Sequence, residues 1–102
     1  MDRIAMLTEV LAQNPSDAFA RYGLAMEHSK AGQTEAALEQ FQKLLELHPD
    51  YTAGYFMAAQ TLARAERTDE ARKMLADGIA SALRTGNQHA QSEMEAMLAE
   101  LA

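Results

Sequence analysis

Histidines and carboxylates are the side chains of this sequence that could do chemistry, and both could bind metal ions. A zinc site needs ligands paired at helical spacing, yet His28, His48 and His89 fall in different predicted helices or at their ends, without carboxylate partners. The 15 acidic residues show nowhere the oxygen-ligand spacing of a calcium loop. The sequence therefore predicts no metal site.

Covalent and phosphate chemistry also lack their residues. The chain has no cysteine, which excludes a thiolate nucleophile, a thiolate metal site and a disulfide. It contains no nucleophile elbow, P-loop or glycine-rich dinucleotide turn, because its 5 glycines are scattered. We therefore expect no catalytic residue, no cofactor and no enzyme activity.

Charge and hydropathy limit the partners. With 9 basic against 15 acidic residues the net charge is -6, which offers no broad positive field to a phosphate backbone. The acidic residues are interpreted as a solvated outer face. The longest charge-free run, Tyr51 to Ala63, is shorter than the roughly 18 residues that span a membrane. Because no export signal is visible, we expect a cytoplasmic protein that binds neither nucleic acid nor membrane.

The elements that carry these residues are predicted to be helices. Alanine and leucine dominate, whereas Val10, Ile4 and Ile79 are the only aliphatic β-branched residues. The chain is 48% hydrophobic and 24% charged over 102 residues, which suits one globular domain. Apolar spacing predicts helices over 3–13, 17–31, 34–48, 51–65, 69–84 and 87–101. The predicted fold class is all-α.

A period of 34 residues runs through the chain. Pro15 and Pro49, the only prolines, stand 34 residues apart at the ends of similar phrases. Residues 18–51 aligned with 52–85 keep size or charge at several positions, such as Tyr22 with Phe56 and Lys30 with Arg64. The identical pairs are Ala25 with Ala59, Ala31 with Ala65, Thr34 with Thr68, and Ala37 with Ala71. The sequence therefore contains two repeats.

These repeats resemble the tetratricopeptide repeat family, whose 34-residue signature sets bulky, small, aromatic, Gly and Pro positions. The first repeat agrees at Leu24, Ala25, Gly32, Ala37, Phe41 and Pro49. The second repeat matches more loosely. The departures from the signature are Arg21 and His28 in the first repeat, and Glu66 and Leu83 in the second. Gly32 suits a left-handed turn, Thr34 and Thr68 suit helix N-caps, and His28 is interpreted as a packed, half-buried ring.

The resemblance implies a right-handed α-α superhelix of helical hairpins, with repeat 1 over 18–51 and repeat 2 over 52–85. The helix within residues 1–14 resembles the second helix of a repeat, so we expect it to cap the amino-terminal end. We expect residues 87–102 to cap the other end through Met94, Met97, Leu98 and Leu101. The predicted core is Leu24, Ala37, Leu38, Phe41, Leu45, Ala59, Leu62, Ala71, Leu75 and Ile79.

The resemblance also implies a concave groove along the first helix of each repeat. Its residues would be Phe19, Tyr22, Met26, Lys30, Phe56, Met57, Gln60 and Arg64. Like small stand-alone bacterial proteins of the family, the chain would be a non-catalytic module that binds a peptide or helix of a partner protein. Lys30 and Arg64 would either favour an acidic stretch of that ligand or only complement the helix dipole.

A second interpretation of the groove remains open. Its apolar floor could be covered by the amino-terminal helix or by another copy of the protein. In the second case the chain would be a self-associating structural protein that forms a homodimer through the groove.

Overall fold

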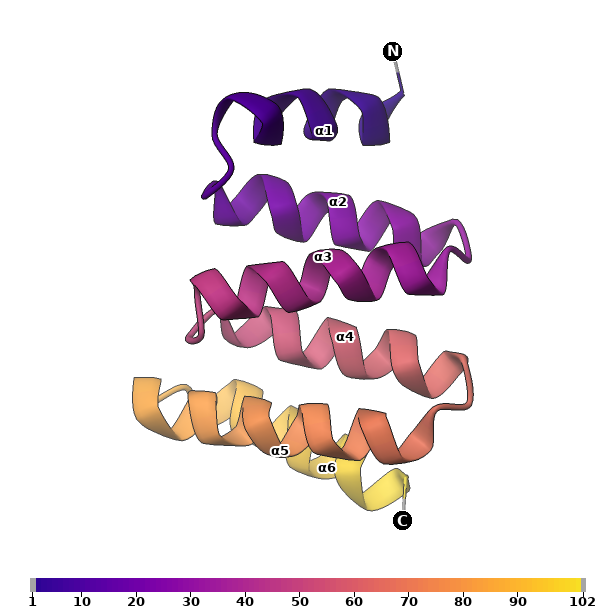
Figure 1. Ribbon diagram of the computed structural model, residues 1–102. Coiled ribbons are helices and arrows are strands. Elements are labelled where there is room, and N and C mark those ends of the chain that lie inside the picture. The colour runs from indigo at the N-terminus through magenta and orange to yellow at the C-terminus, as the bar shows by residue number, and fades with distance from the viewer. Residues whose placement is uncertain (1, 102) are drawn as a thin grey trace.

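The computed structural model describes residues 2–101, which form helices joined by short turns (Figure 1). The helices are α1 (Arg3–Gln13), α2 (Ala18–Lys30), α3 (Thr34–Leu47), α4 (Thr52–Arg64), α5 (Thr68–Thr85) and α6 (Gln88–Glu100). Each bound lies within one residue of the range expected from the sequence. Residues 2–101 contain no strand, so the all-α prediction is confirmed.

The helices stack in chain order from α1 to α6, and α6 lies behind α5 (Figure 1). The most extensive contacts pair α2 with α3 and α4 with α5, which makes two helical hairpins. Within these pairs Ala25, Ala37, Ala59 and Ala71 have no exposed surface. Small side chains allow the two helices of a hairpin to approach closely.

The core consists of three apolar clusters that follow one another along the stack. The first lies between α1 and α2 and contains Leu7, Leu11, Ala20 and Leu24. The second centres on Phe41 and Leu44, and the third joins Tyr55, Leu75, Ala82 and Met94. Of the predicted core, Leu38, Leu45 and Ile79 are only half-buried and the other residues are buried.

Gly78 lets three helices meet at the carboxyl-terminal end of the stack. A Cβ atom at Gly78 would lie 2.5 Å from the Sδ of Met94 and 2.6 Å from the Cβ of Tyr55. Met94 itself has no exposed surface. The missing side chain on α5 therefore provides the space into which α4 and α6 pack.

The expected threonine N-caps are wrong. Thr34 and Thr68 are the first residues of α3 and α5, and the N-cap positions belong to Gln33 and Arg67, whose side chains make no capping hydrogen bond. The cause is the preceding turn. The N–H of Gln33 donates to the carbonyl of His28 at 2.9 Å, which holds Gln33 outside the helix, and Arg67 donates to Leu62 in the same way.

Asparagine and aspartate cap other helices instead. The side chains of Asp2, Asp17 and Asn87 accept hydrogen bonds from backbone N–H groups at the starts of α1, α2 and α6. These caps satisfy donors that have no partner inside the helix.

Candidate protein-binding groove

The apolar face of α2 carries three of the predicted groove residues. Phe19, Tyr22 and Met26 recur every three or four residues, so they lie on one side of the helix. Phe19 is 73% exposed, whereas Tyr22 and Met26 are half-buried. This side of α2 therefore exposes the aromatic ring of Phe19 near the start of the helix.

Tyr22 is held in place by two other rings. Its ring meets Phe41 edge-on with centroids 6.5 Å apart, and it lies tilted on Tyr51 at 5.3 Å. Burial raises the pKa of Tyr22, and the neighbouring Tyr51 adds to the shift. Its hydroxyl therefore stays neutral at physiological pH and leaves the patch uncharged.

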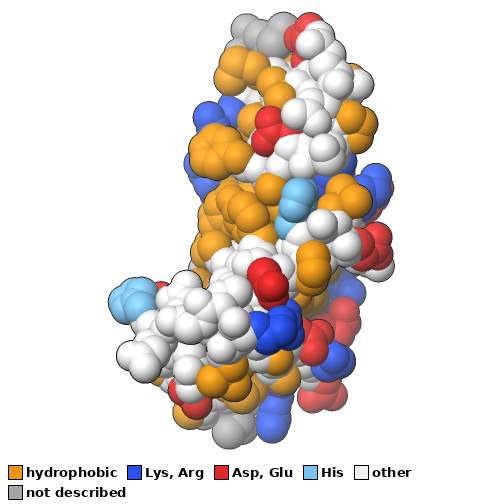
Figure 2. Space-filling view, turned by 90° about the vertical axis from the view of Figure 1, so that its left-hand side faces the viewer, with side chains coloured by type: hydrophobic (Ala, Val, Ile, Leu, Met, Phe, Trp, Pro, Cys, Tyr) orange, Lys and Arg blue, Asp and Glu red, His pale blue; other side chains and the backbone are white. Residues whose placement is uncertain are grey.

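The matching residues on α4 are Phe56, Met57 and Gln60, all half-buried, and the exposed Arg64. Met57 packs against the same cluster as Tyr22 and Met26. Phe56 belongs to the next cluster and lines a small cleft with Ala53 of α4 and Ala90 of α6. Figure 2 shows hydrophobic side chains gathered in the middle of the stack, where its left-hand outline is hollowed.

The structure brings the two predicted cations to one small cleft at the carboxyl ends of α2 and α4. Arg64 donates to the hydroxyl of Ser29 at 2.7 Å, and Ser29 shares a hydrogen bond of 2.8 Å with the hydroxyl of Thr61. Lys30 pairs with Glu27 at 3.1 Å on its own helix. The bonds of Ser29 with Arg64 and Thr61 connect α2 to α4, whereas the ammonium of Lys30 is held by Glu27.

The amino-terminal helix packs on another side of α2. Leu7 and Leu11 of α1 join Ala20 and Leu24 in the first cluster. A Cβ atom at Gly23 would lie 3.3 Å from Leu7. Phe19 stays 73% exposed beside this contact, so α1 does not cover it.

The histidines hold separate structural positions. The Nδ1 of the half-buried His28 lies 2.6 Å from the side-chain oxygen of Gln33, and the Nε2 of His48 lies 2.9 Å from the carbonyl of Ser16. His89 pairs with Glu93 at 3.2 Å, a carboxylate partner that the sequence analysis missed although its spacing is helical. Within residues 2–101 no three His, Asp or Glu side chains group closely enough to hold a metal ion.

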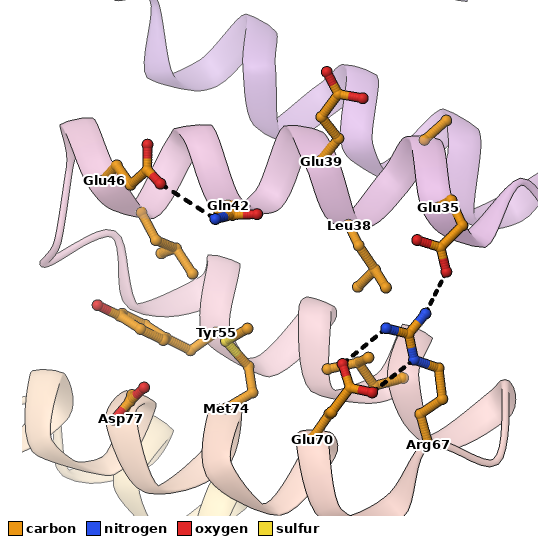
Figure 3. A pocket seen from close by; sticks show the side chains of 13 residues that line it. Glu35, Leu38, Glu39, Gln42, Glu46, Tyr55, Arg67, Glu70, Met74 and Asp77 are labelled. Carbon is orange, nitrogen blue, oxygen red and sulfur yellow. Dashed lines mark hydrogen bonds and ion pairs between the residues drawn. The ribbon is translucent and has the colours of Figure 1, made fainter.

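A larger cleft, which the sequence analysis missed, lies between α3 and α5 (Figure 3). Its volume is about 850 Å³. Its apolar residues include Leu38, Leu45, Tyr55, Leu62 and Met74, and its charged ones are Glu35, Glu39, Glu46, Arg67, Glu70 and Asp77. The available signal was the spacing of Leu38 and Leu45, which lie seven residues apart on α3 among carboxylates.

One end of this cleft is closed by an ion-pair bridge. Arg67, the N-cap residue of α5, pairs with Glu35 of α3 and, at 2.8 Å, with Glu70 (Figure 3). Hydrogen bonding to Arg67 holds the pKa of Glu70 below its usual range. The hydrogen bonds to both carboxylates raise the pKa of Arg67.

None of the helices described within residues 2–101 combines the length and the apolar character needed to cross a membrane. Among solved structures with a similar fold is PcrH in complex with the chaperone binding region of PopD. The match has a TM-score of 0.89 at 18% identity and covers 96% of this chain and 74% of PcrH. It therefore concerns the fold alone.

Closer similarity comes from bacterial proteins. The chain is 32% identical over 95 residues to TPR repeat-containing protein PA0015 of Pseudomonas aeruginosa, which covers 93% of this chain and 90% of that protein. The solution structure of a tetratricopeptide repeat domain protein from Salinibacter ruber is 36% identical with a TM-score of 0.80, covering 86% of this chain and 89% of the other. Residues 28–101 match the family model of the tetratricopeptide repeat. The chain belongs to the tetratricopeptide repeat family.

Proposed function

We propose that this protein is a non-catalytic interaction module that binds a peptide or helix of a partner protein on the face shared by α2 and α4. The observation that carries the proposal is the exposure of Phe19, at 73%, beside the half-buried Tyr22, Met26 and Met57. An apolar patch rimmed by polar groups is typical of a protein-binding surface. Methionine side chains adapt their shape to a ligand, which suits such a surface.

The two cations indicate where an acidic part of the proposed ligand would bind. Lys30 and Arg64 lie together at one end of the face, in a protein whose net charge is -6. A ligand with an acidic stretch at this end would meet the exposed Arg64 and the ammonium of Lys30, whose charge is shared with Glu27. Such rim charges act mainly on the rate of association.

The fold offers a precedent for this use. PcrH, which shares the fold, has been solved in complex with a segment of another protein. That complex supports the idea that a stack of this kind can present a surface to a partner segment. We expect the module to act in the cytoplasm of a bacterium.

The experiment compares the purified chain with variants of the face. Phe19→Ala and Phe56→Ala should each weaken the binding of a captured partner by about 2 kcal/mol, roughly thirtyfold in Kd. The reason is that aromatic anchors dominate interface energies. The matched control is Leu83→Ala, since Leu83 is also exposed, at 61%, but lies at the end of α5. Calorimetric titration of the partner into each variant gives the Kd. Equal affinity for the wild type and both phenylalanine variants would contradict the proposal.

The second candidate function is homodimer formation through the same face. The exposed Phe19 favours it, because a second copy could bury this ring as well as a partner could. Light scattering across a concentration series separates the two. Only the second candidate predicts a dimer that persists at low micromolar concentration and dissociates in the Phe19→Ala variant.

A further inference from the structure

The cleft between α3 and α5 lies on the other side of α4 from the proposed groove. Tyr55 and Leu62 of α4 line the cleft, whereas Met57 packs beside Tyr22. Because successive helix positions turn by about 100°, residues two apart point to nearly opposite sides. Figure 3 accordingly shows α3 and α5 in front, with α4 behind them. The cleft is therefore a separate surface.

The cleft has an apolar floor, and apolar side chains lie on both of its walls. Leu38 and Leu45 of α3 face Met74 of α5, and all three are half-buried. Tyr55 and Leu62 lie at the bottom with 8% and 2% exposure. A volume of about 850 Å³ gives room for several apolar side chains of another molecule.

The charge of the rim differs between the two ends. At one end Arg67 is shared between Glu35 and Glu70. At the other end Glu46 of α3 and Asp77 of α5 stand on opposite sides of Tyr55 (Figure 3).

The cations near this second end already have carboxylate partners. Arg84 donates to the carbonyl of Pro49, which also accepts from the hydroxyl of Tyr55, and it pairs with Asp50 at 2.8 Å. Glu46 accepts a hydrogen bond of 3.3 Å from the neutral amide of Gln42. Asp77 pairs with Lys73, which lies one turn back on α5 and is not among the residues that line the cleft. Among the described residues no cation pairs with Glu46, so its carboxylate leaves a negative charge above the apolar floor.

We propose that this cleft binds a cationic amphipathic helix of another protein. Apolar side chains of the helix would enter between Leu38, Leu45 and Met74, and a Lys or Arg would lie between Glu46 and Asp77. Charge complementarity argues for this occupant. A second copy of this chain, at a net charge of -6, would instead add negative charge to an acidic rim.

The dimensions of the cleft suit a helix of about three turns. Its α3 wall runs from Glu35 to Glu46, which is roughly 17 Å of helix. Recognition of an amphipathic helix uses anchors at positions i, i+3, i+4 and i+7, which span about 11 Å and therefore fit within this wall.

The first test uses a synthetic peptide of about 14 residues, built from leucine at helical spacing and lysine elsewhere. Chemical-shift mapping on the isotope-labelled full chain should place the largest changes at Leu38, Leu45 and Met74. The same peptide with glutamate in place of lysine should not bind. Shift changes confined to α2 and α4, or equal binding of the glutamate peptide, would overturn the proposal.

The second test separates a specific site from general attraction to an acidic protein. Glu46→Gln combined with Asp77→Asn should weaken the lysine peptide about tenfold at low salt. The matched pair Glu93→Gln with Glu95→Gln removes the same charge from α6 and should leave the Kd within about twofold. Equal weakening by both pairs would show general attraction only and would reject the site.

A steric variant adds a readout that is independent of charge. Ala36→Trp on α3 should fill the cleft and abolish peptide binding, with circular dichroism checking the fold. Phe19→Ala should leave peptide binding unchanged, so this proposal and the proposed function can fail separately. If Ala36→Trp does not fold, the charge pairs still decide the question.

Discussion

The carbonyl oxygens of Pro15 and Pro49 each accept a hydrogen bond from a side chain six residues later. The guanidinium of Arg21 donates to Pro15 at 2.8 Å, and the hydroxyl of Tyr55 donates to Pro49 at 2.7 Å. Arg21 and Tyr55 are equivalent positions of the two repeats. Arg21 departs from the family signature, yet it makes the same hydrogen bond from the first turn of α2 to the preceding turn that Tyr55 makes from α4.

Glu66 also departs from the signature, and its backbone adopts the left-handed conformation that glycine has at the equivalent position. Its φ of 61° matches the 75° of Gly32 one repeat earlier. A side chain in the left-handed region costs roughly 1 to 2 kcal/mol. Glu66→Gly should therefore raise the free energy of unfolding by about 0.5 to 1 kcal/mol, after the added freedom of the unfolded chain is subtracted.

Urea denaturation of the Glu66→Gly variant measures this gain. Gly32→Ala provides the reverse control and should lower the free energy of unfolding, because it puts a Cβ into the same backbone conformation. A Glu66→Gly variant less stable than the wild type would show that the Glu66 side chain contributes more than its backbone costs.

Gly78→Ala should destabilise the protein, although alanine is more favourable than glycine within a helix by about 1 kcal/mol. The new Cβ would lie 2.6 Å from the Cβ of Tyr55, which cannot move without its backbone. Overpacking costs roughly 1 to 3 kcal/mol, so we expect a net loss in the midpoint of thermal unfolding.

Gly54→Ala is the control for Gly78→Ala, because its nearest contacts are the flexible ends of Leu44 and Leu45 at 3.0 and 3.1 Å. This variant should lose less stability. An equal loss in both variants would mean that the helix junction at Gly78 is not especially tight.

At the scale of elements, α5 differs from its counterpart α3. Leu47 ends α3, whereas α5 continues past the equivalent Ser81 to Thr85. The reason is that Leu83 stands where the first repeat has Pro49, so a backbone N–H is available and the helix goes on. Gly86, with a φ of 68°, then ends it.

The longer α5 gives α6 its packing surface. Ala82, in the added turn, is buried in the same cluster as Met94. Deleting residues 87–102 should therefore expose the apolar side of α5 and cause aggregation or partial melting. Light scattering and circular dichroism measure these outcomes.

A point variant keeps this prediction specific. Met94→Ala should lower the free energy of unfolding by about 2 to 5 kcal/mol, since the side chain has no exposed surface. The exposed Glu95 provides the control, and Glu95→Ala should change stability by less than about 0.5 kcal/mol. A truncated chain that stays monomeric and equally stable would make α6 a partner-binding tail.

At the scale of the whole molecule, the stack carries two different surfaces. The face of α2 and α4 is apolar with two cations at its rim, and the cleft between α3 and α5 is apolar with carboxylates at its rim. In Figure 2 the hollowed side and the opposite edge, where many charged side chains lie, look away from each other. The two proposed sites therefore lie on different faces of the stack.

The ion pair between Arg67 and Glu70 at the start of α5 should contribute to stability in a pH-dependent way. Arg67 lowers the pKa of Glu70, so the folded state favours the charged carboxylate. This contribution to stability is present above the unfolded pKa of about 4.3 and is lost as the pH falls through the folded value.

Unfolding measured from pH 7 to pH 3 tests this contribution. Glu70→Gln should be less stable than the wild type at pH 7, and the difference should shrink toward pH 3. Glu95→Gln, on the exposed side of α6, should show no such convergence. A Glu70→Gln deficit that is independent of pH would assign the effect to packing.

The six helices and their pairing into hairpins were predictable from the sequence. Apolar spacing within each helix, small residues at Ala25, Ala37, Ala59 and Ala71, and the glycine at Gly32 are local or periodic features, and each dictates a conformation without knowledge of distant residues. The bounds were accordingly predicted to within one residue. Of the candidate groove, the spacing of Phe19, Tyr22 and Met26 on one side of α2 could be predicted for the same reason.

Tertiary structure alone decided the rest. Gly78 is required because Tyr55 of α4 and Met94 of α6 both pack against α5 at this position. The cleft exists because α3 and α5 both pack on α4 and leave Leu38 and Leu45 only half-buried. Both features depend on where neighbouring helices lie. The spacing of residues within one helix does not encode the distance between helices.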